Sequence, residues 1–495
     1  MRSARTASCR QAAAAAAAVL LLTTGCAARF DRPAAGSPQA AGDGLTQDQG
    51  GAVPVTPTGA PTSLSTVPGG AGGVQAAGTT GAVTGSGTTG SAPGTAQTAA
   101  PGSSSAPTRT DSSTRTSTGA SVQRGSTTGV TATTIKIALF VPKTGAAPVP
   151  PTIDAQAQNY WDYVKSKGGI YGRNVSLTIY DTQSTEAGAK QAVLQAESDG
   201  VFAAISLDRI SVEGALVTEL HKAGIPHLIN QMPHDQAIPS DGFYIGTDQV
   251  HNGVQIADYM AHTLKVHKVG FVGEADPTAY PARNAFVAEA QRLGLQVVHN
   301  EVVDGMSNQF LSEAQKMKND AAQAMWMYVA PNNAINLSKE STADGYHPTW
   351  VSSSIAWGFN LVLTPSSGAL DGAKSFSPWG GLSDPRYATY NKVNTAGKSQ
   401  DDKDVGLPAW GYGQIIAAAL KAAGPDLGRN SFRNAMQNLR TGSTDEVTHT
   451  AFCWPPLDFT GGKRYGSGDR TIVMTVKGSG ANGVWATESD YKSVY

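Results

Sequence analysis

A hundred-residue stretch without an aromatic side chain limits how much of this chain can fold. Residues 31–130 contain no Phe, Tyr or Trp, although the whole chain has 12 Phe, 15 Tyr and 8 Trp. Gly, Thr, Ala, Ser and Pro make up 77 of these 100 residues. Such a composition buries too little apolar surface to offset the entropy of ordering the backbone, so it predicts a flexible tether over residues 26–130. The folded part is then residues 131–495, a length that suits two lobes better than one core.

The first 25 residues have the layout of an export signal. Arg2, Arg5 and Arg10 precede an apolar run, residues 12–22, which is too short to span a bilayer as a helix. The run ends in Thr-Thr-Gly-Cys26, which resembles a bacterial lipobox. We therefore expect an exported protein whose first mature residue, Cys26, carries the lipid that anchors it to the outer face of the cytoplasmic membrane. A plain signal peptide with an incidental cysteine is the alternative.

Charge and cysteine content argue against several classes of protein. The net charge is −1 and there is no cluster of Lys and Arg, so the chain is poorly suited to binding nucleic acid by charge. Cys9 lies inside the signal and Cys26 at its end, which leaves Cys453 without a partner for a disulfide. Its neighbours Phe452 and Trp454 favour a buried small hydrophobic residue over a catalytic thiol.

Motifs for catalysis, nucleotides and metals are missing or misplaced. Two matches to Gly-x-Gly-x-x-Gly, at 85–90 and 478–483, lie in the tether and between two late strands, so neither can direct a helix N-terminus at a phosphate. The pairs His227/His234 and His262/His267 have neither a convincing metal-ligand spacing nor nearby thiols. We expect no catalytic residues, no metal and no cofactor.

From Thr134 onward the chain alternates between strand and helix signals. Short runs rich in β-branched and aromatic residues predict strands, and longer segments with apolar residues along one side predict helices. Strands are expected at residues 135–141, 175–180, 202–205, 227–229, 268–272, 296–303, 324–328, 350–352, 471–476 and 484–486. Helices are expected at residues 155–165, 187–197, 212–223, 253–264, 282–293, 311–318, 334–343, 409–423 and 432–439. This order predicts an α/β protein with two lobes, each a mainly parallel sheet flanked by helices.

The loops that follow the strands are where a ligand is expected. In open parallel sheets, ligands bind beyond the carboxyl ends of the strands, where helix N-termini offer free N–H groups to an anionic group. Two such lobes facing each other would enclose a small molecule. The loops concerned are residues 142–151, 207–211, 230–235, 274–280, 328–333 and 352–357.

Three segments, taken in order, resemble type I solute-binding proteins of the Leu/Ile/Val-binding branch. Ile135-Lys-Ile-Ala-Leu-Phe-Val-Pro-Lys-Thr-Gly145 looks like the first strand and loop of that family. Gly168-Gly-Ile-Tyr-Gly-Arg173 looks like the turn before its second strand, and Gly224-Ile-Pro226 like the approach to its fourth. The resemblance implies the type I periplasmic-binding-protein fold, without catalysis. It also implies the capture of amino acids, amides, urea or related small solutes outside the membrane for delivery to an ABC permease.

The same resemblance suggests how the chain is divided. Lobe 1 is expected at about 133–246 plus 380–446, and lobe 2 at about 247–379 plus 447–495. Three hinge crossings are expected near residues 244–248, 376–381 and 442–450. We expect a monomer.

Six residues are candidate ligand contacts: Arg209, Ser211, Asn230, Tyr280, Ser354 and Trp357. Arg209 stands near the place where amino-acid binders of the family have a small hydroxyl residue. Ser354 stands near a place that often holds an acid for the ligand's ammonium group. These departures argue against a free branched-chain amino acid and favour a small polar solute with an anionic or carbonyl end.

Each candidate also has a purely structural explanation. Arg209 could pair only with Asp208, Tyr280 could be a surface aromatic, Trp357 could belong to the core, and Ser211 could be a helix cap. The function has alternatives too: a ligand-binding sensor subunit on the same fold that signals to a membrane receptor, or a structural lipoprotein of the cell wall.

Overall fold

The computed structural model describes residues 124–145, 148–232, 237–305, 307, 309–353, 357–396, 400–466 and 470–492. All of them belong to one compact unit. The predictions for the export signal, for Cys26, for the tether up to residue 123 and for Ser354 lie outside the described residues. Residues 124–130, assigned to the tether from their composition, belong to the folded part: Ser126 O accepts from Arg429 N at 2.8 Å, and Gly129 O accepts from Lys136 N at 2.8 Å.

The first lobe is built on a five-stranded parallel sheet with the order β2-β1-β3-β4-β5. Its strands are β1 (Thr134–Val141), β2 (Asn174–Asp181), β3 (Ala203–Ser206), β4 (His227–Ile229) and β5 (Gly242–Tyr244). Successive residues of β1 point to opposite faces of the sheet, so Ile137 and Leu139 pack into one hydrophobic core while Ala138 and Phe140 pack into another. Helices therefore cover both faces, as a parallel sheet requires.

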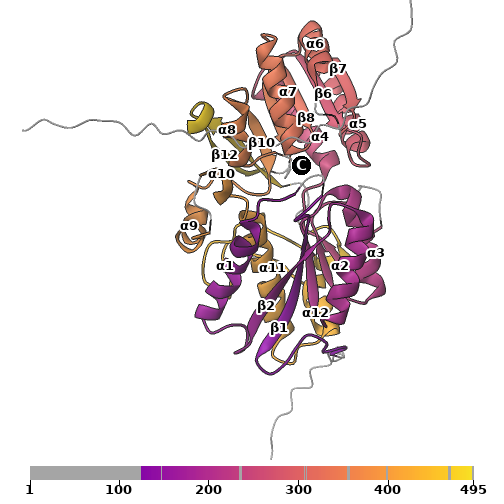
Figure 1. Cartoon of the computed structure of the whole chain (residues 1–495), viewed down its shortest axis with the longest axis vertical. Helices are drawn as coiled ribbons and strands as arrows, with labels where there is room; N and C mark the ends of the chain where they lie inside the picture. The colour runs from indigo at the N-terminus through magenta and orange to yellow at the C-terminus, as the bar shows by residue number, and fades with distance from the viewer. Residues whose placement is uncertain are drawn as a thin grey trace, which may run out of the picture. The chain divides into compact units, whose positions relative to one another are not determined.

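Helices from two distant parts of the chain cover this sheet. They are α1 (Ile153–Ser166), α2 (Glu186–Ser198), α3 (Ile210–Lys222), α11 (Leu407–Ala423) and α12 (Arg429–Gln437). Figure 1 shows α11 and α12, late in the chain, packed against the lobe that contains β1 and β2. Phe432 of α12 meets Phe202 with ring centroids 5.5 Å apart.

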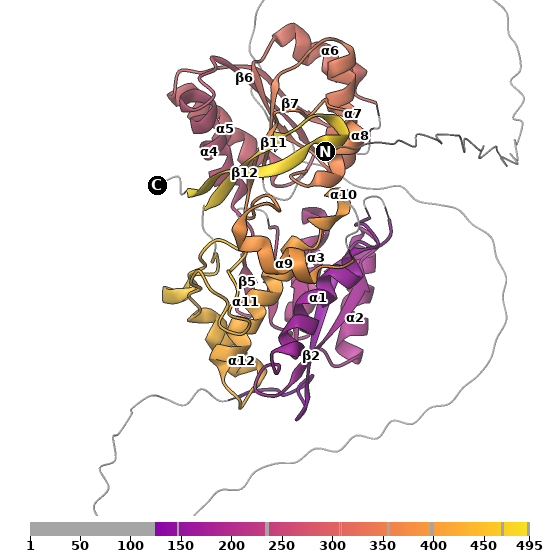
Figure 2. The ribbon, with the colours of Figure 1, turned by 90° about the vertical axis from the view of Figure 1, so that its left-hand side faces the viewer.

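The second lobe is built on a seven-stranded sheet with the order β12-β11-β10-β9-β8-β6-β7. Its strands are β6 (Lys268–Glu274), β7 (Gln296–Val303), β8 (Ala324–Tyr328), β9 (Thr349–Ser353), β10 (Lys374–Ser377), β11 (Thr471–Lys477) and β12 (Val484–Lys492). The strands from β7 to β10 pair in parallel, whereas β11 and β12 are added antiparallel. Figure 2 shows β11 and β12, the yellow end of the chain, beside the elements of this second lobe.

Four long helices flank this sheet: α4 (Gln249–His262), α5 (Ala279–Arg292), α6 (Leu311–Asp320) and α7 (Pro331–Ala343). The shorter helices are η1 (Asn360–Val362), α8 (Leu363–Ser366), η2 (Pro385–Tyr387), α9 (Ala388–Val393), α10 (Gln400–Lys403), η3 (Thr460–Gly462) and η4 (Gly480–Asn482). Local sequence determines where several of these helices begin and end. Asp248 caps α4 by accepting from Val250 N at 2.8 Å, and Gly294 follows α5 with a φ of 75°, which favours glycine. No described helix is long and apolar enough to cross a membrane.

The chain passes between the two lobes near two of the three expected places. The first crossing joins β5 to α4, and the second follows β10. The third differs from the expectation of residues 442–450, because the chain stays on the first lobe as far as Gly466. Tyr244 N donates to Arg464 O at 2.8 Å, and Trp454 Nε1 donates to Ile245 O at 2.9 Å. Apolar packing helps to keep this segment on the first lobe, because the rings of Phe459 and Phe243 pack edge-on with their centroids 5.5 Å apart.

Candidate ligand-binding site

A cavity of about 330 Å³ lies where the carboxyl ends of the two sheets meet. All six loops expected from the sequence contribute to it. Its lining comprises Val141, Pro142, Pro148, Val149, Pro150, Ile153, Leu207, Asp208, Arg209, Ile210, Asn230, Gln231, Gln249, Glu274, Asp276, Tyr328, Val329, Ala330, Pro331, Asn332, Ser353, Phe359, Leu361, Val405 and Pro408. The cavity could hold about ten water molecules at ~30 Å³ each, and hence a small solute.

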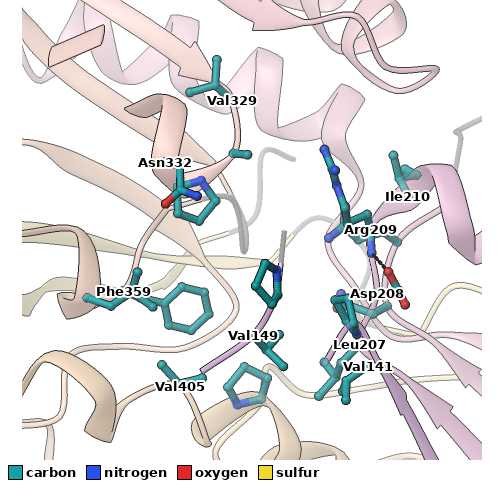
Figure 3. Close-up of a pocket in the computed structure, with 18 of the residues that line it drawn as sticks. Val141, Val149, Leu207, Asp208, Arg209, Ile210, Val329, Asn332, Phe359 and Val405 are labelled. Atoms are coloured by element: carbon teal, nitrogen blue, oxygen red, sulfur yellow. Dashed lines mark hydrogen bonds between the residues drawn. The ribbon is translucent and has the colours of Figure 1, made fainter. Parts of the chain in front are cut away.

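Arg209 reaches across the cavity from the first lobe to the second. It stands at the N-cap position of α3 without a side-chain capping bond, and its backbone N–H donates to Asp208 Oδ1 at 2.6 Å. The guanidinium contacts the other lobe, with Nη2 3.8 Å from Glu274 Oε2. Figure 3 shows this side chain extending away from Leu207 and Val141. The hydrogen bond between Arg209 and Asp208 is therefore made by the backbone, and the guanidinium lies at the cavity.

Glu274 is a buried acid held by its own lobe. Its Oε1 accepts from Ala330 N and from Asn333 Nδ2, both at 2.7 Å. Burial raises the pKa of Glu274, while those two hydrogen bonds and the charge of Arg209 work in the opposite direction. The 3.8 Å separation from Arg209 is longer than a hydrogen bond, so the guanidinium is attracted to Glu274 without being saturated by it.

Two further buried acids lie on the first-lobe side of the cavity, Asp208 in its lining and Glu213 behind it. Asp208 is buried and accepts from the Thr182 hydroxyl as well as from Arg209 N. Glu213 lies behind it and accepts from the Ser206 hydroxyl. Burial raises the pKa of both carboxyls, and the charge of Asp208 adds to the effect on Glu213. These acids hold the β3–α3 loop in shape through donors of the protein itself.

Asn230 lines the cavity just after the end of β4. Its side chain is buried, and its Oδ1 accepts from the Tyr412 hydroxyl of α11. That bond orients the amide, and Nδ2 is buried and meets no acceptor in the described part of the chain. A buried donor without an acceptor is costly, but this nitrogen has no surface exposed to the cavity, so Asn230 shapes the wall without offering Nδ2 to a ligand in this arrangement.

Apolar side chains form the rest of the lining. Val149, Phe359 and Val405 come from the β1–α1 loop, the segment after β9, and the turn before α11. Figure 3 shows these three side chains around the lower part of the cavity, with Arg209 higher up. Five of the lining residues are prolines, which have no backbone N–H to offer a ligand: Pro142, Pro148, Pro150, Pro331 and Pro408.

The structure places only some of the candidate residues at this cavity. Arg209 and Asn230 line it. Ser211 is exposed in the first turn of α3, and Tyr280 is 45% exposed with Arg283 stacked 5.3 Å from its ring. Trp357 is buried and donates from Nε1 to Met327 O at 2.9 Å. None of these three is among the lining residues.

Several lining residues were not singled out from the sequence. Glu274 had a usable signal, because it is an acid at the start of the expected loop 274–280, and in the structure it is the last residue of β6. Val405 and Pro408 had none, because only tertiary packing brings the start of α11 to the cavity. Cys453 is buried as expected, and burial raises the pKa of its thiol well above the usual value. Among the described residues, no group of three or more His, Cys, Asp or Glu is placed to hold a metal.

Comparisons with known proteins agree with this architecture. A family model described as periplasmic binding protein matches residues 134–456. A search of curated proteins found no match. Among solved structures, a fatty acid ABC transporter substrate-binding protein from Thermomonospora curvata aligns with a TM-score of 0.61 at 18% identity, covering 75% of this chain and 96% of that one.

Two further solved structures contain different ligands. The branched-chain amino acid transporter substrate binding protein LivJ from Streptococcus pneumoniae, in complex with isoleucine, aligns with a TM-score of 0.61 at 16% identity, covering 72% of this chain and all of that one. A solute binding protein of an ABC transporter from Rhodopseudomonas palustris, in complex with 3,4-dihydroxy benzoic acid, aligns with a TM-score of 0.59 at 15% identity, covering 73% and 98%. At such identities the likeness establishes the fold and leaves the ligand open.

Proposed function

The chain belongs to the periplasmic binding protein family, and from this membership we propose that it captures a small polar solute between its two lobes and delivers it to an ABC permease. The family and fold are those of solute-binding proteins, which act outside the cytoplasm and are not enzymes. We propose further that the protein is a lipoprotein tethered through Cys26.

One observation carries the proposal: a single cavity is lined by strand-end loops of both lobes. A ligand there touches both lobes at once, so its binding energy favours the arrangement in which they are close together. The chain crosses between the sheets three times, and such crossings are where hinge rotation is absorbed in two-lobed binding proteins. Capture by closure is the function that this geometry supports best.

Ligand-dependent stability tests the proposal. The full chain is purified and unfolded by heat in the presence of a broad panel of amino acids, amides, sugars and carboxylates. A solute held at about 100 times its Kd should raise the free energy of unfolding by ~2.7 kcal/mol. A matched variant, Arg209→Leu, should lose most of this effect because the guanidinium at the cavity no longer meets the ligand. If no member of the panel stabilises the protein, solute capture is the wrong function.

A further inference from the structure

The hydrogen-bonding groups left open in the cavity restrict the chemistry of the solute. Among the described lining residues Arg209 is the only basic one, and the one ion pair of its guanidinium with a described residue, Glu274, is 3.8 Å long. A guanidinium has five N–H donors, so this side chain has more donors than the described part of the cavity wall has acceptors for it.

The acids of the lining are, in contrast, largely occupied by protein donors. Both oxygens of Asp208 accept hydrogen bonds, and Glu274 Oε1 accepts two while its Oε2 faces Arg209. Asp276 Oδ1 accepts from Thr278 N at 2.7 Å and from Thr278 Oγ1 at 2.5 Å. Asp276 is also half-exposed, so water can solvate its charge without a ligand ammonium. The guanidinium of Arg209 is therefore the charged group of the lining that its described protein partners match least, and a ligand carboxylate would match it.

The other end of the cavity suits a part of the ligand that makes no hydrogen bonds. Phe359 and Leu361 from the second lobe face the same space as Val149 and Ile153 from the first. Val149 is flanked by Pro148 and Pro150, so the backbone on either side of it has no N–H to donate. A polar ligand group placed here would lose its bonds to water and gain none, whereas an apolar group would gain by leaving water.

We infer that the solute is a monocarboxylate with an apolar aliphatic or aromatic body and no α-ammonium group. Its carboxylate binds the guanidinium of Arg209, and its body packs against Val149, Phe359 and Leu361. This inference rests on the proposed function and narrows it to one class of solute. Arg209 is the residue that selects an anionic ligand, because its planar guanidinium can donate two parallel hydrogen bonds to one carboxylate.

Three probes of the same shape test the inference by calorimetric titration of the full chain. They are 4-methylpentanoate, its amide 4-methylpentanamide, and leucine, which is the same acid with an α-ammonium group. The carboxylate should bind at least about tenfold more tightly than either of the others, since each lacks the charge or adds an ammonium without a buried partner. Titrations with 3-phenylpropanoate and phenylalanine repeat the comparison with an aromatic body.

Variants test the carboxylate contact and the apolar contacts of the ligand separately. Arg209→Lys keeps the positive charge but loses the planar guanidinium with its paired N–H donors, and should weaken 4-methylpentanoate binding by about tenfold or more. Leu361→Asn should weaken the apolar acids and leave the affinity for acetate, which has almost no body, unchanged. Glu274→Gln removes the charge that competes for Arg209 and should tighten carboxylate binding. Arg283→Lys, on α5 away from the cavity, is the matched control and should change nothing.

The outcomes distinguish this inference from the broader function. Leucine binding as tightly as 4-methylpentanoate, or Glu274→Gln weakening the carboxylate, would overturn the inference while solute capture stands. Binding of an amide or a sugar in place of the acids would overturn it in the same way. If none of these probes and no member of the wider solute panel binds, the proposed function fails together with the inference.

Discussion

At the scale of single residues, His299 shows how a buried charge is kept in the second lobe. Its Nε2 lies 2.8 Å from Glu313 Oε1 and its Nδ1 lies 2.8 Å from Asp320 Oδ2. Burial alone would lower the pKa of His299, but the two carboxylates outweigh it and the pKa is raised above 6.5. Lys316 Nζ donates to Glu301 Oε2 at 2.8 Å and lies 3.4 Å from Glu313 Oε2. Both acids that favour the protonated form of His299 are on α6.

We predict that His299→Gln destabilises the protein in a pH-dependent way. A raised pKa means that the folded state binds the proton more tightly, so this stabilisation is fully present below the pKa of the unfolded chain, near 6.5. It is lost as the pH rises through the higher folded-state pKa. Urea unfolding should show a loss of about 1–3 kcal/mol at acidic pH that shrinks in alkaline buffer. His262→Gln, an exposed histidine paired with Asp258, is the control; an equal, pH-dependent loss there would contradict the assignment.

At the scale of elements, the segment that ends at Gly466 is fastened to the first crossing by Trp454. Its indole N–H donates to Ile245 O at 2.9 Å, and its ring lies 4.7 Å from that of Tyr412 and 5.8 Å from that of Trp379. Trp454→Phe keeps an aromatic ring but leaves a buried carbonyl without its donor. We expect a loss of about 1–3 kcal/mol in the free energy of unfolding, measured in urea. Tyr280→Phe, which changes an exposed aromatic residue, should alter the free energy of unfolding by no more than about 0.5 kcal/mol. Equal losses in both variants would contradict the role assigned to the Trp454 hydrogen bond.

Strands of very different length could be predicted from sequence. The sequence located β1 and β7, of eight residues each, and also β3 and β4, of four and three residues. β5 and β10 are as short as these and were missed; Lys-Ser-Phe-Ser in β10 contains only one large apolar side chain. A strand that short is stabilised by its neighbours in the sheet, which no local pattern records.

The site was predictable to the extent that topology fixes it. Strand-end loops meet in a two-lobed α/β protein, so the sequence could place Arg209 and Asn230 at the cavity from their positions after β3 and β4, and their contact with a ligand stays a prediction. Side-chain direction was not predictable in this way. Tyr280 and Ser211 lie in the expected loops but are not in the cavity lining, because the first turn of a helix presents residues to several sides.

At the scale of the whole molecule, the family places capture outside the cytoplasm, and the N-terminal sequence says how we expect the protein to stay near a permease. We expect residues 26–123 to form a Gly-, Thr- and Ser-rich coil; about a hundred such residues would have an average end-to-end distance of ~50–60 Å, enough to let the binding lobes move above a membrane. The apolar run before Cys26 is too short to span the bilayer, so we expect anchoring to depend on a lipid on Cys26. Cys26→Ala should therefore move the protein from the membrane fraction to the soluble fraction of cells, with solute binding unchanged. Cys9→Ala, which alters a cysteine inside the signal, should stay with the membrane; a Cys26→Ala protein that sediments with the membrane as firmly as the parent would show that something other than this lipid holds it there.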